Sequence, residues 1–154
     1  MMPIYETDAD KTKEEIIAGI FCKRFKYNCI PAPAMARWDF CITKPTLFKG
    51  TWLNVVQGIA EVKVRSCKVG AYPTMMIDAD KISYLRNHTS DKVKGLLIVA
   101  WVDAIGWIDI AEKSFLSTGG RFDRQDPNDH KMVLHYPIEK FNLIVDKREK
   151  KAEL

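Results

Sequence analysis

Apolar residues of the chain recur at two different periods, which separate helices from strands. Residues 16–25 carry apolar side chains at helical spacing, and Asp8 or Asp10 is suited to cap the helix that this pattern predicts. At about 100° per residue, Glu14 falls at the edge of the apolar stripe, whereas Glu15 points away from it. We therefore expect Glu14 to be the acid of this helix that lies near the sheet, with Glu15 as the alternative.

Residues 37–43, RWDFCIT, alternate between apolar and polar positions and predict a strand. Because successive side chains of a strand point to opposite faces, Trp38, Phe40 and Ile42 are expected on one face and Asp39 on the other. The proline-rich stretch CIPAPAM that precedes this strand predicts an extended connection.

A second alternating stretch, residues 59–67 with the sequence IAEVKVRSC, is typical of a buried strand but carries charged residues. Glu61, Lys63 and Arg65 share one face of this strand, since residues i and i+2 of a strand point the same way. Val62 and Val64 face the other side. The charged face is therefore either solvated or part of a functional site.

The remaining segments predict further elements of both kinds. Asp78 is suited to cap a helix over residues 79–87, and the apolar residues 95–102 are typical of a strand covered on both faces. Further extended segments are expected at residues 73–77, 107–110, 132–136 and 141–145. One long loop is expected at residues 118–130. This order predicts an α/β fold in which a mixed β-sheet is flanked by helices.

Length and composition predict one globular domain. A chain of 154 residues with 47% apolar and 29% charged residues can bury its own core and is neither disordered nor fibrous. We expect the domain to cover residues 1–145 and the charged residues 146–154 to form a frayed tail. No apolar run approaches the length of a membrane span and the N-terminus lacks a secretory apolar region, so we expect a soluble, cytoplasmic protein without a membrane partner.

Charge and cysteine usage narrow the classes of function. The net charge is only +4, but residues 23–49 carry six Lys or Arg against Asp39 alone, a local charge of +5 that favours a polyanionic partner. The four cysteines and three histidines show no metal-ligand spacing, which argues against a zinc site and favours free thiols in a reducing compartment.

The two charged strands together offer a metal site. Asp39 and Glu61 can meet if their strands are neighbours, because neighbouring strands lie about 4.8 Å apart. Two carboxylates and the backbone carbonyl of Val62 form a hard oxygen site that suits Mg²⁺ or Mn²⁺, and Glu14 can add a third carboxylate. An ammonium at Lys63 can orient a water or neutralise a phosphoryl group, which favours hydrolysis. The alternative is a half-exposed strand whose charges only pair across the sheet.

The order of a helix with Glu14, then Asp39 in RWDFCI, then Glu61-Val62-Lys63, then a second helix resembles the PD-(D/E)XK superfamily of metal-dependent nucleases. That superfamily includes restriction endonucleases, resolvases and repair nucleases. The stretches EVKVRSCKVGAYPTMMIDADKISYL and GGRFDRQDPNDHKMVLHYPIEKF further resemble small nuclease-like proteins of phages and prophages. The chain departs from the motif at one place, since Trp38 stands where the superfamily name has proline.

The resemblance implies a restriction-endonuclease-like core and a DNA endonuclease that uses Mg²⁺ or Mn²⁺, in the host cytoplasm if a phage encodes it. It implies that Asp39 and Glu61 hold the metal, that Lys63 positions or activates the attacking water, and that Glu14 can recruit a second ion. Many resolvase-like relatives act as dimers, so a homodimer is open.

Three further basic residues suit contacts with phosphate, with an ordinary surface charge as the alternative for each. Arg65 extends the charged face, Lys68 follows in the next loop, and the resemblance places Lys81 near the site on the second helix. Such contacts fix the register of a duplex without reading its sequence. Two alternatives to the enzyme stay open: a nuclease fold retained as a DNA- or protein-binding module, and a structural or host-takeover phage protein.

Overall fold

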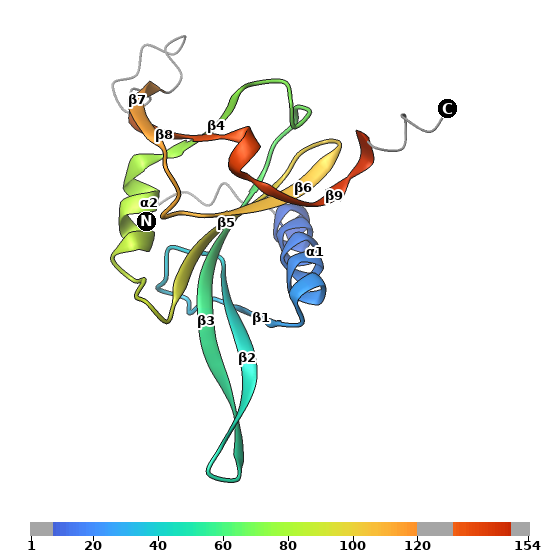
Figure 1. The fold of residues 1–154 in the computed structure, drawn as a ribbon, viewed down its shortest axis with the longest axis vertical. Coiled ribbons are helices and arrows are strands. Elements are labelled where there is room, and N and C mark those ends of the chain that lie inside the picture. The colour runs from blue at the N-terminus through green and yellow to red at the C-terminus, as the bar shows by residue number, and fades with distance from the viewer. Residues whose placement is uncertain (1–7, 120–130, 149–154) are drawn as a thin grey trace.

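The computed structural model describes residues 8–119 and 131–148 of the chain. Helices and strands follow one another in chain order: α1 (Asp8–Phe25), β1 (Asn28–Pro31), β2 (Phe40–Phe48), β3 (Thr51–Val64), β4 (Thr74–Asp78), α2 (Ala79–Arg86), β5 (Lys94–Ala100), β6 (Ala104–Asp109), β7 (Phe115–Gly119), β8 (Lys131–Pro137), the 3₁₀ turn η3 (Ile138–Lys140) and β9 (Asn142–Asp146). The fold is α/β, as predicted (Figure 1).

A six-stranded sheet in the order β1-β2-β3-β5-β6-β9 forms the centre of the fold. β3 and β5 pair in parallel, with Glu61 opposite Leu97, and the other neighbours pair antiparallel, so the sheet is mixed. β5 is buried from Gly95 to Ala100, which confirms the prediction of a strand covered on both faces. The sheet thus agrees with a restriction-endonuclease-like core.

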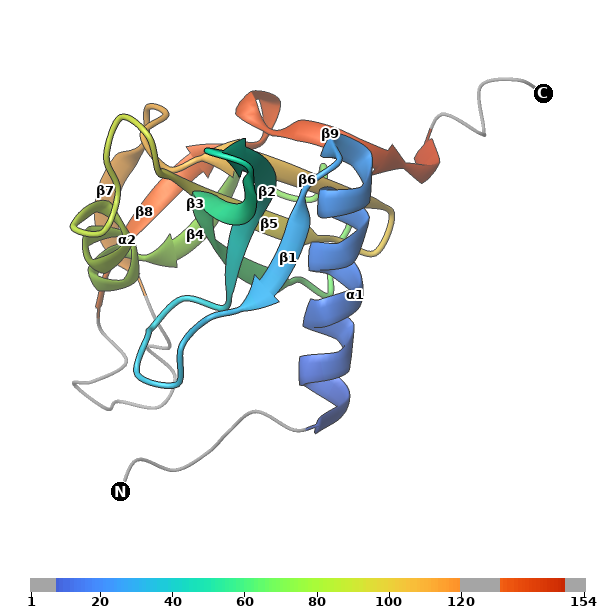
Figure 2. The same cartoon turned by 90° about the horizontal axis from the view of Figure 1, so that it is seen from below.

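Two hydrophobic cores lie on opposite faces of this sheet. On one face α1 packs through Ile17 and Phe21 against the sheet residues Val62 and Ile98. On the other face α2 and the three-stranded sheet β4-β8-β7 cover Leu97 and its neighbours. Figure 2 shows α1 on one side of the sheet and α2 with the small sheet on the other. β3 therefore lies between two buried layers, which explains its apolar pattern.

The buried hydroxyl of Tyr136 links the small sheet to the core. Tyr136 is fully buried on β8, and its Oη donates a hydrogen bond of 2.8 Å to the carbonyl of Ile110. The same carbonyl also accepts a hydrogen bond of 3.2 Å from the guanidinium of Arg86, so Tyr136→Phe removes one of its two donors. We therefore expect the free energy of unfolding to fall by about 0.5–1.5 kcal/mol, the net value of one hydrogen bond. Urea unfolding monitored by circular dichroism measures this change. An unchanged midpoint would show that the bond from Arg86 alone satisfies the carbonyl.

Several sequence predictions are confirmed. The carboxylate of Asp78 accepts a hydrogen bond of 3.0 Å from the Asp80 amide and caps α2. Glu14 is half-buried and Glu15 exposed, as their helical positions predict. The proposed caps of α1, Asp8 and Asp10, lie outside the described side chains. Neither described helix is long and apolar enough to cross a membrane.

Other predictions are wrong in detail. β2 begins only at Phe40, so Trp38 precedes the strand and packs against the α2 side, opposite to Phe40. Thr118 and Gly119, which were expected in a loop over residues 118–130, belong to β7, and residues 120–130 lie outside the described chain. The sequence also did not predict β1 as a strand or the small sheet, whose pairing joins segments far apart along the chain.

Candidate active site

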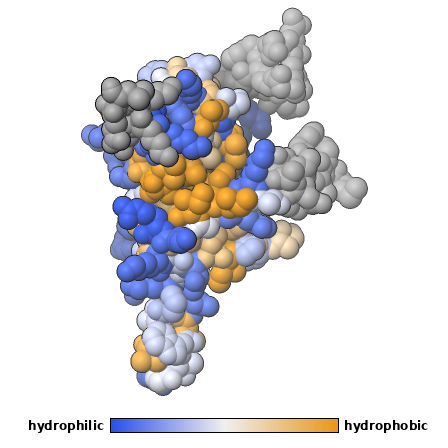
Figure 3. Space-filling model, turned by 90° about the vertical axis from the view of Figure 1, so that its right-hand side faces the viewer, coloured by the Kyte–Doolittle hydropathy of each residue, from blue (hydrophilic) through white to orange (hydrophobic). Residues whose placement is uncertain are grey.

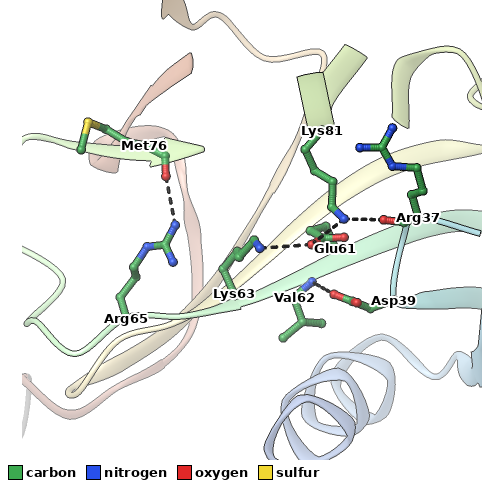
Figure 4. Close-up of polar contacts among 8 residues, drawn as sticks. All are labelled: Arg37, Asp39, Glu61, Val62, Lys63, Arg65, Met76 and Lys81. Carbon is green, nitrogen blue, oxygen red and sulfur yellow. Dashed lines mark hydrogen bonds and ion pairs between the residues drawn. The ribbon is translucent and has the colours of Figure 1, made fainter. Parts of the chain in front are cut away.

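The burial of Glu61 shows whether the charged face of β3 is solvated. Its side chain is only 3% exposed, and the strand directs it toward the α2 side together with Ile59. Lys63 on the same strand and Lys81 on α2 each place Nζ 3.4 Å from Oε1 of Glu61 (Figure 4). Glu61 is therefore a buried carboxylate covered by two partly exposed lysines, and not a solvated surface group.

Asp39 reaches the same cluster from the segment before β2. Its Oδ2 accepts a hydrogen bond of 2.8 Å from the amide of Val62, the residue between Glu61 and Lys63. The backbone of Asp39 is held on both sides, since its amide donates to Ala60 O at 3.0 Å and its carbonyl accepts from Ala32 N at 3.0 Å. Asp39 is therefore fixed against β3, close enough to act on Glu61 electrostatically.

The electrostatics of Glu61 favour a cation beside its carboxylate. Burial, and after it the neighbouring charge of Asp39, raise the pKa of Glu61 to about 7, although Lys63 and Lys81 both oppose the shift. The second carboxylate oxygen, Oε2, is buried and has no hydrogen-bond partner among the described residues. A buried carboxylate oxygen without a partner is costly, so the site fits an additional cation at Oε2.

Basic residues line the opening next to this cluster. A recess of about 260 Å³ is lined by Arg37, Lys63, Arg65 and Lys81, with Ile77 and Asp78. Arg65 donates a hydrogen bond of 3.0 Å to Met76 O, and burial lowers the pKa of its guanidinium. The exposed Lys68 lies on neighbouring recesses, one of which it shares with Arg65. Phosphate can thus approach Glu61 past several cations.

Glu14 belongs to a helix that covers the other face of the sheet. It is carried by α1, which packs on the face formed by Val62, whereas Glu61 points to the opposite face. Within residues that the structure describes, no three Asp, Glu, His or Cys side chains gather closely enough to hold a metal ion. The structure thus brings Asp39, Glu61, Lys63 and Lys81 together, and the role of Glu14 stays a prediction.

One member of the cluster was missed from the sequence. The backbone carbonyl of Arg37 accepts a hydrogen bond of 2.5 Å from Lys81 Nζ, which holds this lysine over Glu61. The Arg37 side chain stacks over the ring of Tyr84, 4.9 Å from its centroid. The position of Arg37 two residues before Asp39, in the most basic part of the chain, was the available signal.

A comparison with known families identifies the family of the chain. Residues 1–144 match the family described as "Phage putative PDDEXK endonuclease". The chain belongs to this family. Asp39 and the Glu61-Val62-Lys63 triplet stand in the order that gives the PDDEXK endonucleases their name, with Trp38 in place of the proline. No curated protein and no solved structure matches the chain.

Proposed function

We propose that the protein is a divalent-metal-dependent DNA endonuclease that hydrolyses phosphodiester bonds at the Asp39, Glu61 and Lys63 cluster. The observation that carries the proposal is the buried carboxylate of Glu61, whose Oε2 has no described partner while Oε1 pairs with two lysines. A module that only binds DNA gains nothing from the carboxylates of Asp39 and Glu61, because they repel phosphate. The family to which the chain belongs supports the same reaction.

Mg²⁺ or Mn²⁺ suits these oxygen donors. Oε2 of Glu61 and the carboxylate of Asp39 are hard ligands, and the carbonyl of Val62 and the carboxylate of Glu14 are the further candidates. When bound, such an ion lowers the pKa of a water and polarises a phosphoryl oxygen. It would also offset the mutual repulsion of Asp39 and Glu61, which now raises the pKa of Glu61.

Lys63 supplies the polar group closest to Glu61 on the same strand. From its position 3.4 Å from Oε1, the ammonium can donate a hydrogen bond to the attacking water or to a phosphate oxygen as negative charge develops. Its side chain is 35% exposed, so substrate can reach it. Lys81, Arg65 and Lys68 then orient the DNA backbone without reading its sequence.

Calorimetry with Mn²⁺ tests whether the carboxylates bind metal. We expect wild-type protein to give a saturable heat, and Asp39→Ala to lose most of it because one of the two clustered carboxylates is gone. Asp91→Ala, a change of an exposed aspartate, is the matched control and should keep the heat. Equal heats in all three proteins would rule out this metal site.

Cleavage of supercoiled, linear and branched DNA in the presence of Mn²⁺ tests the reaction itself. We expect wild-type protein to cut at least one of these substrates and Asp39→Ala to cut none. If metal binds but no substrate is cut, the protein is a binding module that has kept its metal site. If neither occurs, the charged cluster is structural.

A further inference from the structure

β2 and β3 continue beyond the six-stranded sheet as a free ribbon, which we call the arm (residues 43–56). β1 pairs with β2 only up to Thr43, and β5 pairs with β3 only from Gly58 onward, so the arm residues pair almost entirely with each other. Lys49 and Gly50, both with positive φ, form the turn at the tip. Figure 1 shows the arm as a twisted ribbon that projects from the body.

The arm exposes far more apolar surface than an isolated ribbon tolerates. Six large apolar side chains of the arm are between 38% and 69% exposed: Leu47, Phe48, Trp52, Leu53, Val55 and Val56. A two-stranded hairpin is marginally stable in water by itself, and beyond Thr43 and before Gly58 no strand of the described residues pairs with either outer edge of this one. An exposed apolar surface of this kind marks a site of contact with another molecule.

An apolar groove lies at the base of the arm. It is lined by Phe25, Tyr27, Leu96 and Trp107 on the α1 side, and by Gln57 and Gly58 where the arm joins the body, with a volume of about 330 Å³. Asp109 and Lys94 form its charged rim. Figure 3 shows a broad apolar band across the body above the arm, and further apolar side chains on the arm itself.

The face of the arm that continues this groove carries one apolar side chain in each cross-strand pair. Ile42 pairs with Gly58 on the α1 side, and a register shift follows, so the pairs Lys44–Val55, Thr46–Leu53 and Phe48–Thr51 alternate back to the same side. Val55, Leu53 and Phe48 therefore extend the apolar lining of the groove toward the tip. The other exposed apolar side chains of the arm, Leu47, Trp52 and Val56, lie on its opposite face. The groove and the side chains of Val55, Leu53 and Phe48 form one continuous surface, which we call the strip.

We propose that this strip binds a second copy of the chain, with the two arms antiparallel. The arm is roughly 20 Å long at about 3.3 Å per residue. Two arms of equal length that lie antiparallel place each tip at the base of the other arm, over the partner's groove. The interface is then isologous, as in most homodimers. Lys49 at the tip approaches Asp109 at the rim, which gives complementary charges.

The composition of the arm favours protein over DNA as the occupant. Affinity for DNA comes mainly from cations that neutralise phosphates, and the arm carries only Lys44 and Lys49 beside its six exposed apolar side chains. Buried interface centres are instead enriched in aromatic residues, which matches Phe48 on the strip.

Sedimentation equilibrium without DNA or metal tests the dimer, so its outcome does not depend on the proposed nuclease activity. We expect wild-type protein to have twice the 17.7 kDa mass of one chain at micromolar concentration. Leu53→Ser should raise the dimer dissociation constant about a hundredfold, because the interface contains this side chain twice. Phe48→Ser at the tip should act similarly.

Leu116→Ser is the matched control. Leu116 is 56% exposed on β7 and Leu53 is 46% exposed on β3, so both changes remove an exposed leucine from a strand. Leu53 lies inside the proposed interface and Leu116 outside it. Thermal melts confirm that all variants fold. A monomeric wild type, or a dimer that Leu53→Ser and Phe48→Ser leave unchanged, would overturn the proposal. If Leu53→Ser and Phe48→Ser lose DNA affinity while their mass in solution stays that of wild type, the proposal is also overturned, and the arm is a DNA-binding element.

Discussion

Lys63→Met is expected to lower the rate of Mn²⁺-dependent DNA cleavage by about 10² to 10³-fold while the heat of Mn²⁺ binding stays close to that of wild type. The ammonium is placed 3.4 Å from Glu61 Oε1 and does not hold metal itself, so its removal affects the reacting water or phosphate. Loss of one positioned donor to developing negative charge typically costs this much. Single-turnover cleavage with labelled DNA measures the rate.

Lys81→Met provides an unusually close control for this change. Lys81 Nζ lies at the same 3.4 Å from the same Glu61 oxygen, so either variant removes one ion pair from the carboxylate. Because Lys81 also donates to Arg37 O, it positions Glu61 and the substrate backbone, and we expect its loss to lower cleavage only about tenfold. Equal losses in the two variants would mean that Lys63 acts only as a counter-charge.

Glu61→Gln is expected to stabilise the metal-free protein at pH 8 and to abolish its stabilisation by Mn²⁺. Burial and then Asp39 raise the pKa of Glu61 from about 4.5 to about 7. Between these two pH values the folded state binds more protons than the unfolded state, so the free energy of unfolding falls as pH rises through this window. Above pH 7 the ionised carboxylate costs the fold up to roughly 3 kcal/mol, which glutamine avoids.

Thermal melts at pH 4 and pH 8, with chelator or with Mn²⁺, measure both effects. At pH 4 the two proteins should melt at similar temperatures, since the carboxyl is then protonated in both states. At pH 8 with chelator the variant should melt several degrees higher. Mn²⁺ at a hundred times its dissociation constant stabilises a binding protein by about 2.7 kcal/mol, and only wild type should show this gain.

Glu139→Gln, a change of an exposed glutamate, controls for the loss of one negative charge. It should leave the melting temperature and the response to Mn²⁺ unchanged. A variant Glu61→Gln that melts lower than wild type at pH 8 would show that the two lysine contacts outweigh the cost of burial. The cluster would then be a stable ion-pair network with no need of metal.

The core of the site could be predicted because it follows from local patterns. Glu61 and Lys63 share a face through strand alternation alone, and Asp39 meets them because β2 and β3 are joined by a hairpin and pair directly. Apolar residues on both sides of Glu61 indicated a buried strand, but they left open whether its charged face is solvated. These relations need no knowledge of distant contacts.

The rest of the fold depends on contacts that sequence patterns do not encode. The small sheet joins β4 to β8, about sixty residues apart, and its strands are short. Trp38 was assigned to the wrong side because the strand begins after Asp39 and not before it. The placement of Lys81 over Glu61 likewise required the position of α2 against the sheet. The exposed arm could not be foreseen, because alternation does not show which strand residues lack a neighbouring layer.

A crystal structure of the protein grown with Mn²⁺, with anomalous diffraction data, tests the metal site most directly. We expect one anomalous peak within roughly 2.0–2.3 Å of Glu61 Oε2 and of a carboxylate oxygen of Asp39. Occupied Mn²⁺ sites elsewhere, with Glu61 still bound only to Lys63 and Lys81, would contradict the proposal that these two carboxylates hold the catalytic ion.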